Sequence, residues 1–397
     1  MSAEASREPR RSRLPRTVIA LGVASFFNDF GSEMSFPLLP ALLVSLGAGP
    51  TYLGVVEGIA DATASLLKLV AGQLSDRFGN SKLLVTLGYG LPSIARPLLA
   101  FATAPLHVLG IRVTDRVGKG LRTAPRDALI AGSVSAADSG RAFGFHRALD
   151  HSGAVVGPLC AAALLALGVS VEHVFLAALV PSVLALVAVA AVRPLPRAPA
   201  LQAQRTESAP PDRKTRTSFQ GYLAIVALFA FANSSDAFLL LRAHELGVPD
   251  AQVLLLWTVL HVSRAGCTVL GGKLADRFSR ARLLALGWIV FALCYLGMGF
   301  AHAMWHVWTL FVVYGLHTGI CEPAERALVR DLAAAGTRGR SYGLFHGVIG
   351  ACAIPAGLST GWIWQRWGAS AALSSSAALA VLAAALLVRW ERRAAQG

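Results

Sequence analysis

The chain has 397 residues, of which 55% are hydrophobic and only 15% are charged, and its mean hydropathy is +0.57. Soluble globular chains carry about 25% charged residues, so this composition excludes disordered, collagen-like and coiled-coil proteins and disfavours a large soluble enzyme. The formal charge is +14, and the basic residues concentrate in the first sixteen positions, in a central stretch at 193–216 and in short gaps between apolar runs. That distribution indicates membrane topology and no nucleic-acid partner.

Apolar runs long enough to cross a bilayer recur along the whole chain. Twelve membrane helices are predicted, and in chain order they cover residues 17–46, 51–74, 82–104, 106–132, 141–167, 172–192, 219–243, 250–274, 282–301, 306–332, 341–365 and 371–389. The predicted fold class is an all-α membrane protein. Its expected parts are a basic tail (1–16), a first six-helix bundle (17–192), a linker (193–218), a second six-helix bundle (219–389) and a short tail (390–397).

The gaps between the predicted helices alternate in charge. Every second gap is basic, from Arg77 and Lys82 in the first to Arg338 and Arg340 in the last. The gaps between them, near 47–50, 104–106, 168–173 and 301–306, contain no Lys or Arg. Because basic loops stay on the cytoplasmic side, both termini are expected to be cytoplasmic. The Ala- and Arg-rich composition favours a bacterial inner membrane.

The second half of the chain repeats the first at an offset near 200 residues. Leu-Ser-Asp-Arg-Phe, starting at Leu74, recurs as Leu-Ala-Asp-Arg-Phe, starting at Leu274. The segment 140–144 recurs at 339–343, and the surroundings of Pro125 recur near Pro323. Three matches in one order predict two six-helix repeats of the same orientation. Parallel repeats with a site between them near the bilayer midplane are typical of transporters that work by rocking.

The segment Gly72-Gln-Leu-Ser-Asp76-Arg77-Phe-Gly79 resembles the signature between the second and third helices of the major facilitator superfamily (MFS), and the resemblance covers essentially the whole chain. It implies the MFS fold and a gating role, because in that superfamily this cluster latches the cytoplasmic ends of the two halves together. The gating residues implied in this way are Gly72, Asp76, Arg77, Gly79, Lys82, Gly272, Asp276 and Arg277. The second copy lacks the final glycine and carries Ser279 instead.

Charged residues crowd one face of the fourth predicted helix. The seven are Arg112, Asp115, Arg116, Lys119, Arg122, Arg126 and Asp127. At 100° per residue they fall within a sector of about 140°. A charge at the bilayer centre costs roughly 2.5–3.5 kcal/mol, so this stripe must line an aqueous path or face acidic partners on neighbouring helices. Acids and bases are nearly balanced in the first half, which predicts a paired network.

Two sets of candidate site residues follow from these charges. Burial disfavours a charged carboxylate and a nearby cation favours it, so a carboxylate whose partner changes during alternation could load and release a proton. The proton-coupling candidates are Asp29, Glu33, Glu57, Asp61 and Asp150, with Asp29, Glu33 and Asp61 preferred. The substrate-cavity candidates are Asn28, Arg112, Asp115, Arg116, Lys119, Arg147, His151, Asp236, His261 and Arg264. Arg112 and Arg116 would hold an anionic substrate group, and Arg122, Arg126 and Asp127 are interpreted as gate or structural pairs.

The predicted function is a monomeric secondary active transporter that moves a small solute by alternating access, coupled to protons and directed outward. No enzyme motif is found, and the run 116–122 lacks the spacing of a phosphate loop, so no enzymatic activity is predicted. Scattered single cysteines and histidines without ligand spacing predict neither a metal site nor a cofactor. The alternatives are a symporter or exchanger of an anionic metabolite, metal efflux, and a receptor or scaffold that transports nothing.

Overall fold

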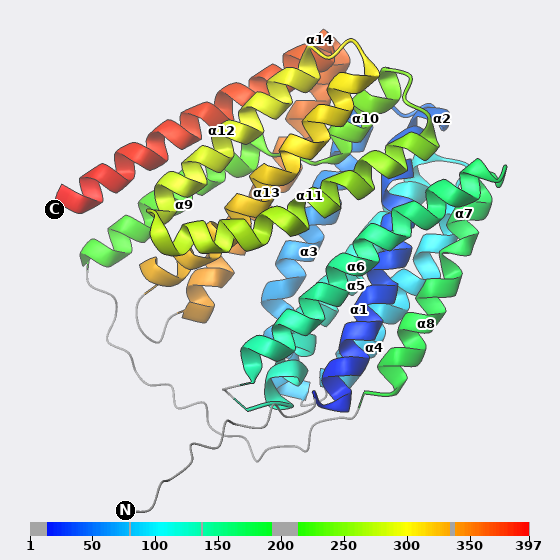
Figure 1. The fold of residues 1–397 in the computed structure, drawn as a ribbon, viewed down its shortest axis with the longest axis horizontal. Coiled ribbons are helices and arrows are strands. Elements are labelled where there is room, and N and C mark those ends of the chain that lie inside the picture. The colour runs from blue at the N-terminus through cyan, green and yellow to red at the C-terminus, as the bar shows by residue number, and fades with distance from the viewer. Residues whose placement is uncertain (1–13, 79–80, 136–137, 193–212, 334–337, 397) are drawn as a thin grey trace, which may run out of the picture.

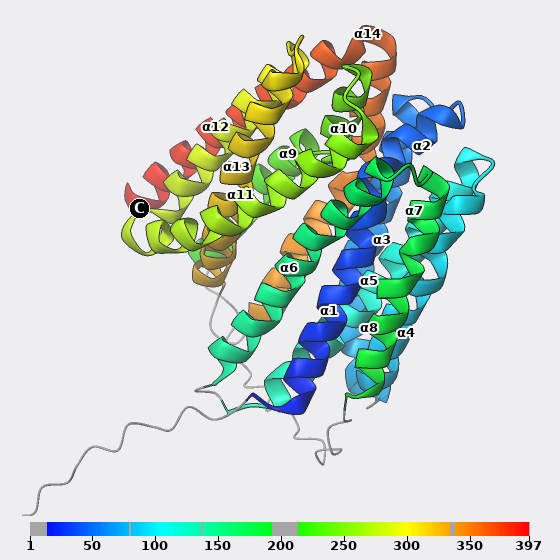
Figure 2. The same cartoon turned by 45° about the vertical axis from the view of Figure 1, so that its right-hand side comes forward.

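The computed structural model describes residues 14–78, 81–135, 138–192, 213–333 and 338–396. In these residues it contains helices and no strands, and the helices form two groups that lie side by side (Figures 1 and 2). The first group comprises α1 (Arg16–Ser35), η1 (Phe36–Leu38), α2 (Leu39–Ser45), α3 (Pro50–Phe78), α4 (Ser81–Ala95), η2 (Arg96–Phe101), α5 (Pro105–Gly132), α6 (Ser139–Ala166), α7 (Val171–Ala177) and α8 (Leu179–Ala190). We call this group the first half.

The second half comprises α9 (Arg213–Ala232), α10 (Ala237–Glu245), α11 (Asp250–Arg277), α12 (Arg280–Gly299), α13 (Met304–Leu332) and α14 (Arg338–Gln396). A non-helical Gly368 divides α14 into two passes. Short elements that continue one another, such as α1 with η1 and α2, together match single predicted spans. Each predicted span therefore coincides with helical structure to within a few residues, which is consistent with twelve membrane helices.

Several ends of these helices follow from their local sequence. Pro105 starts α5, where its fixed backbone angle suits the first turn. A Leu-Gly pair directly follows each of the helices α2, α6 and α10, and the glycines Gly47, Gly168 and Gly247 have φ of 79°, 82° and 76°. Gly368, with φ of 87°, ends the first pass of α14 in the same way. Glycine reaches this left-handed conformation at little cost, so it closes a helix. The pairs 47/247 and 168/368 confirm the repeat at an offset of 200.

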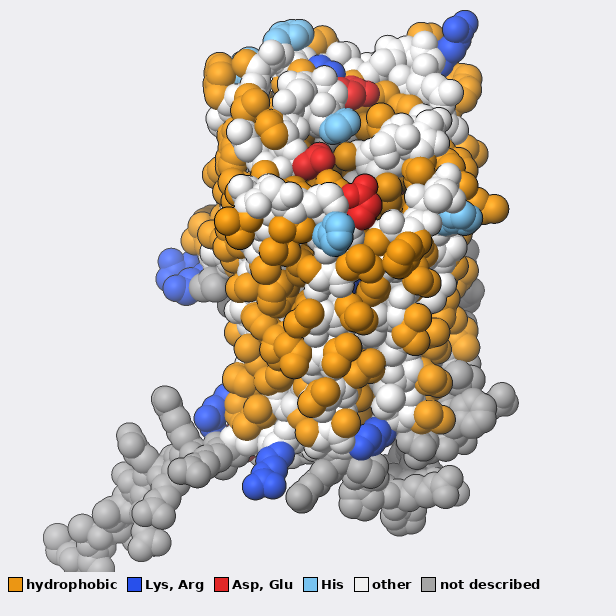
Figure 3. All heavy atoms as spheres, turned by 90° about the vertical axis from the view of Figure 1, so that its right-hand side faces the viewer, with side chains coloured by type: hydrophobic (Ala, Val, Ile, Leu, Met, Phe, Trp, Pro, Cys, Tyr) orange, Lys and Arg blue, Asp and Glu red, His pale blue; other side chains and the backbone are white. Residues whose placement is uncertain are grey.

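The outer surface suits a bilayer. In the described residues, seven helices are long and apolar enough to cross a membrane, and α1, α3, α5 and α13 are not among them. Figure 3 shows an apolar band on the outer face of the first half, with Lys and Arg below it and on one flank, and with Asp, Glu and His together with some Lys or Arg near its upper end. Large side chains such as Leu167, Val180 and Val187 are exposed on this half. Three charged residues of α5, by contrast, are buried within the protein: Arg112, Asp115 and Arg122.

Glycines allow close helix contacts within and between the halves. Gly153 and Gly157 of α6 lie against the carbonyl groups of Phe26 and Phe30 on α1. Between the halves, α3 packs along α14 and α6 packs along α11. A methyl group added at Gly54 of α3 would overlap the backbone carbonyl of Gly357 on α14, and the reverse substitution would do the same. The two halves therefore meet backbone to backbone at this point.

The expected linker and tails are described only in part. Residues 1–13 and 193–212 lie outside the described residues. The helix α9 begins at Arg213, so the last residues of the predicted linker 193–218 are helical, and α14 continues to Gln396 through the predicted tail.

Candidate functional site: charged side chains within and between the halves

A buried ion-pair network occupies the interior of the first half. Arg112 of α5 donates from Nε and Nη2 to the two carboxylate oxygens of Glu57 on α3, at 2.9 and 2.7 Å. Asp115, one turn later on α5, accepts from Nε of Arg96 at 2.7 Å. All four side chains are at most 5% exposed. A bidentate guanidinium–carboxylate pair is among the stronger hydrogen-bonded pairs, and here it satisfies charges that lipid could not.

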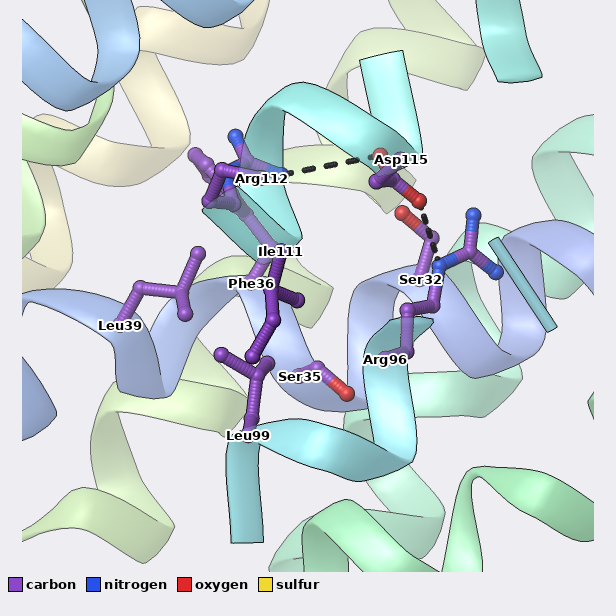
Figure 4. Close-up of a pocket in the computed structure, with 9 residues that line it drawn as sticks. All are labelled: Ser32, Ser35, Phe36, Leu39, Arg96, Leu99, Ile111, Arg112 and Asp115. Carbon is purple, nitrogen blue, oxygen red and sulfur yellow. Dashed lines mark hydrogen bonds and ion pairs between the residues drawn. The ribbon is translucent and has the colours of Figure 1, made fainter. Parts of the chain in front are cut away.

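The network extends to α1 through Asn28. Arg96 donates to the backbone carbonyl of Asn28 at 2.8 Å and to its side-chain oxygen at 3.2 Å, and Asn28 donates to Asp29 at 2.8 Å. Figure 4 shows Asp115 between Arg96 and Arg112 at a small cavity. The cavity measures about 10 Å³, which leaves room for one water molecule at most. The structure thus brings together the candidates Glu57, Arg112 and Asp115 on α3 and α5.

Other predicted residues on α3 and α5 are more accessible. Asp61 has a side chain that is 47% exposed, and its carboxylate lies 3.7 Å from Nε of Arg116. Lys119, one turn further along α5, is exposed. Arg126 contacts Asp127 at 2.9 Å, and Asp127 is 44% exposed. Charged side chains that solvent can reach, on helices flanked by apolar sequence, indicate a hydrated space beside α3 and α5.

Two aromatic side chains of the second half reach a carboxylate of the first. Trp257 of α11 donates its indole N–H to Glu33 of α1 at 2.7 Å. Nε2 of His261, one turn later on α11, lies 3.8 Å from the same carboxylate oxygen. The ring of Trp257 also packs against Phe36 with centroids 5.1 Å apart. Glu33 and His261 were predicted site residues, and the structure brings them together across the halves.

A second cross-half contact centres on Glu322 of α13. It accepts from Arg147 of α6 at 3.0 Å, from Arg264 of α11 at 3.0 Å and from Arg326 at 2.6 Å. Arg147 also lies 3.8 Å from Asp150. One carboxylate of the second half therefore binds arginines from both halves. Asp150 itself accepts from Ser25 of α1 at 2.5 Å, and His151 is half-buried beside it.

Asp236 lies where the seventh membrane pass is broken. Residues 233–236 separate α9 from α10, and Asp236 accepts from the hydroxyl group of Tyr314 on α13 at 2.6 Å. The charges that act on Asp236 come from both halves: Arg264 and His261 lie on α11 of the second half, and Asp61 lies on α3 of the first. Broken membrane helices at mid-depth commonly line binding sites, because they expose backbone groups to a cavity and not to lipid.

The residues implied as a gate are described only in part. Gly79 lies outside the described residues, as do the side chains of Asp76, Arg77 and Asp276. The backbone of Gly72, Asp76 and Arg77 forms the end of α3. Lys82 donates to the carbonyl group of Ala190 at 3.2 Å, Arg277 is exposed, and Gly272 has open space around its Cα.

Several residues of these contacts were not among the predicted site residues: Ser25, Arg96, Trp257, Tyr314, Glu322 and Arg326. Two of them show what the sequence could and could not reveal. Trp257 is an aromatic residue in an apolar run, and nothing in that run distinguishes a hydrogen-bond donor from a membrane anchor. The sequence could have pointed to Glu322, because this residue lies beside Pro323 in the segment that repeats the surroundings of Pro125.

Known proteins with similar sequence and structure were found over the whole chain. The family model described as Major Facilitator Superfamily matches residues 21–241 and 221–397. An uncharacterised MFS-type transporter of Methanocaldococcus jannaschii is 31% identical over 359 residues, covering 89% of both chains. An uncharacterised protein of Mycobacterium tuberculosis is 30% identical over 357 residues, covering 88% of this chain and 87% of the other. The multidrug resistance protein MdtH of Escherichia coli is 31% identical over 130 residues, 32% of each chain.

Solved structures of transporters share the fold. A bacterial homologue of the human lysosomal transporter Spinster, in an inward-facing and occupied conformation, superposes with a TM-score of 0.74 at 16% identity, covering 94% of this chain and 96% of the other. A peptide transporter of the POT type gives a TM-score of 0.80 at 14% identity, covering 97% and 96%. With the repeat, the apolar surface and the charged interface, these matches establish that the chain belongs to the Major Facilitator Superfamily and is a membrane transporter.

Proposed function

We propose that this transporter is a proton-coupled exporter of a small solute, with Glu33 as the carboxylate that couples proton binding to alternation. The observation that carries the proposal is the contact of Glu33 with Trp257 and His261 across the halves. An ionised Glu33 accepts a charge-assisted hydrogen bond from the indole N–H of Trp257, and the imidazole of His261 lies beside the same carboxylate. A proton on Glu33 removes its charge and weakens both interactions, so the contact between α1 and α11 depends on protonation.

Charged and polar groups from both halves lie around Glu33. The charge of Lys119 on α5 acts on Glu33, the imidazole of His261 on α11 lies beside it, and Asp29 lies one turn away on α1. A change of charge at Glu33 is therefore felt by polar groups on both halves. The solute would occupy the space beside Arg116, Lys119, Arg147 and Arg264, which the halves expose in turn.

Export is supported by the partial similarity to MdtH, a protein named for multidrug resistance. A cytoplasmic position of both termini, in an inner membrane, is supported by the basic residues at the helix ends near them, such as Arg16 and Arg389. The symporter or exchanger of an anionic metabolite is the second candidate, and the arginines around Glu322 favour it.

The test is flux in proteoliposomes with an imposed pH gradient and a panel of cationic, neutral and anionic solutes. Glu33→Gln should abolish flux driven by the pH gradient while solute exchange without a gradient continues, because only the titrating group is lost. Glu172→Gln is a matched control, since Glu172 lies at the start of α7 and lacks a cross-half contact among the described residues. Undiminished proton-driven flux in Glu33→Gln, with loss in Asp29→Asn or Asp61→Asn, would move the coupling role to those residues.

A further inference from the structure

A groove on the outer face of the second half has charged and apolar parts that are separated along its length. It measures about 610 Å³ and lies between α12 and the second pass of α14. One end of the groove, beside the start of α12 and the end of α14, is lined by Arg282, Arg389 and Arg392. The rest of the lining is apolar and includes Ala285, Ile289 and Val388. Figure 1 shows α12 beside the terminal part of α14.

The arginines point their charge to the surface. All three are exposed, and Arg282 stays 70% exposed even though its Nε contacts Glu391 at 3.1 Å. Glu391 also accepts from Ser279, so that carboxylate is shared. Arg389 and Arg392 are three residues apart and thus project from one side of α14. The three arginines outnumber the one acid at the groove, which leaves a positive charge for a ligand to neutralise.

The spacing along the helices matches the depth profile of a lipid. Ile289 follows Arg282 by seven residues, and Val381 precedes Arg389 by eight, so each apolar wall extends about 10–12 Å inward from the arginines. A phosphate at the level of the arginines would therefore have its acyl chains beside the apolar wall. Guanidinium groups suit phosphate because they present paired N–H donors.

We propose that this groove binds one anionic phospholipid, with its phosphate among Arg282, Arg389 and Arg392 and its acyl chains between α12 and α14. A second copy of this chain is a poorer occupant, because a two-fold contact on this face would set the same arginines against each other. The leaflet follows from the proposed orientation, which places the groove on the cytoplasmic side, where anionic lipids are attracted by basic residues. The proposal does not depend on proton coupling or on the solute.

The experiment is native mass spectrometry of the full-length protein titrated with phosphatidylglycerol or phosphatidylcholine. The wild type should retain one phosphatidylglycerol in preference to phosphatidylcholine. Arg389→Gln/Arg392→Gln should weaken phosphatidylglycerol binding about fivefold for each arginine removed. The matched control is Arg16→Gln/Arg330→Gln, which removes the same charge from exposed arginines at the same end of the bundle and should leave the affinity unchanged.

A second variant tests the apolar part separately. Ala385 is an exposed groove residue, so Ala385→Trp fills the groove with the arginines in place. It should weaken phosphatidylglycerol binding, whereas glycerol phosphate, which has no acyl chains, should fail to compete in the wild type. Equal affinity for the two lipids, equal loss in the control variant, effective competition by glycerol phosphate, or a dimer that the groove variants break would each overturn the proposal. A flux assay is not needed, so failure here is distinguishable from failure of the proposed transport mechanism.

Discussion

The indole N–H of Trp257 on α11 donates to Glu33 on α1 over 2.7 Å, joining positions 224 residues apart in the sequence. In the repeat, Trp257 occupies the position that Glu57 has in the first half, at an offset of 200 residues. Glu57 binds Arg112 within its own half. Equivalent positions on two repeats therefore serve different contacts, one inside a half and one between the halves.

Trp257→Phe is expected to loosen the contact between α1 and α11 that joins the two halves at Glu33. It keeps the ring and removes the donor, and a hydrogen bond to a charged group contributes about 1.5–3 kcal/mol. Hydrogen exchange at the backbone of α2 and α10 should rise. Trp367→Phe is the control, because Trp367 is 59% exposed. Unchanged exchange in Trp257→Phe would show that the hydrogen bond does not hold the halves together.

Lowering the pH is expected to act in the same direction as Trp257→Phe. Protonation of Glu33 removes the negative charge that the indole and His261 contact, so exchange at α2 and α10 should rise as the pH falls. This dependence should disappear in Glu33→Gln, which is neutral at every pH. If the Glu33→Gln protein keeps the full pH dependence of hydrogen exchange, another titrating group is responsible for it.

Glu57→Gln is expected to destabilise the protein strongly. It leaves Arg112 charged, 5% exposed and without its bidentate partner, and breaking a buried pair costs about 3–5 kcal/mol. The melting temperature in detergent should fall. Glu57→Leu/Arg112→Leu removes both charges and should recover much of that loss. If the double variant is as unstable as Glu57→Gln, the loss of stability comes from altered packing and not from the unpaired charge of Arg112.

Glu322→Gln is expected to slow transport more than Arg147→Gln does. Arg147 is 41% exposed, so its contact contributes about 1 kcal/mol or less, a change of roughly fivefold at most. Removing the charge of Glu322 leaves three arginines without their shared partner. Flux in proteoliposomes measures both variants, with Glu391→Gln as a control remote from the interface of the halves. Equal effects of the two substitutions would mean that the shared carboxylate has no special role.

Gly54→Ala is expected to separate α3 from α14 locally, because the added methyl group overlaps the carbonyl of Gly357. Overpacking of this kind costs typically 1–3 kcal/mol. Gly110→Ala is the matched control on α5, where an added methyl group meets open space and helix propensity favours alanine. Melting temperatures should fall for the first and hold or rise for the second. A stable Gly54→Ala protein would contradict the close contact.

The spans, the repeat and the family could be predicted because hydropathy and local motifs are properties of single segments. The prediction of a paired network is confirmed for Arg112 with Glu57 and for Arg96 with Asp115. The spacing on one helix gives the face on which charges lie. It does not give the rotation of one helix against another, so it could not predict that Glu57 and Arg112 face the interior of the first half. The partners Trp257 and Glu322 depend on how the two halves meet.

The break at residues 233–236 divides the seventh pass into segments that share no continuous helical hydrogen bonding. The segment α10 can consequently change its tilt without bending α9, since no intact helix has to be deformed. A local swing of α10 would leave in place the stack of Phe229 on α9 against Trp288 on α12, whose ring centroids lie 4.3 Å apart.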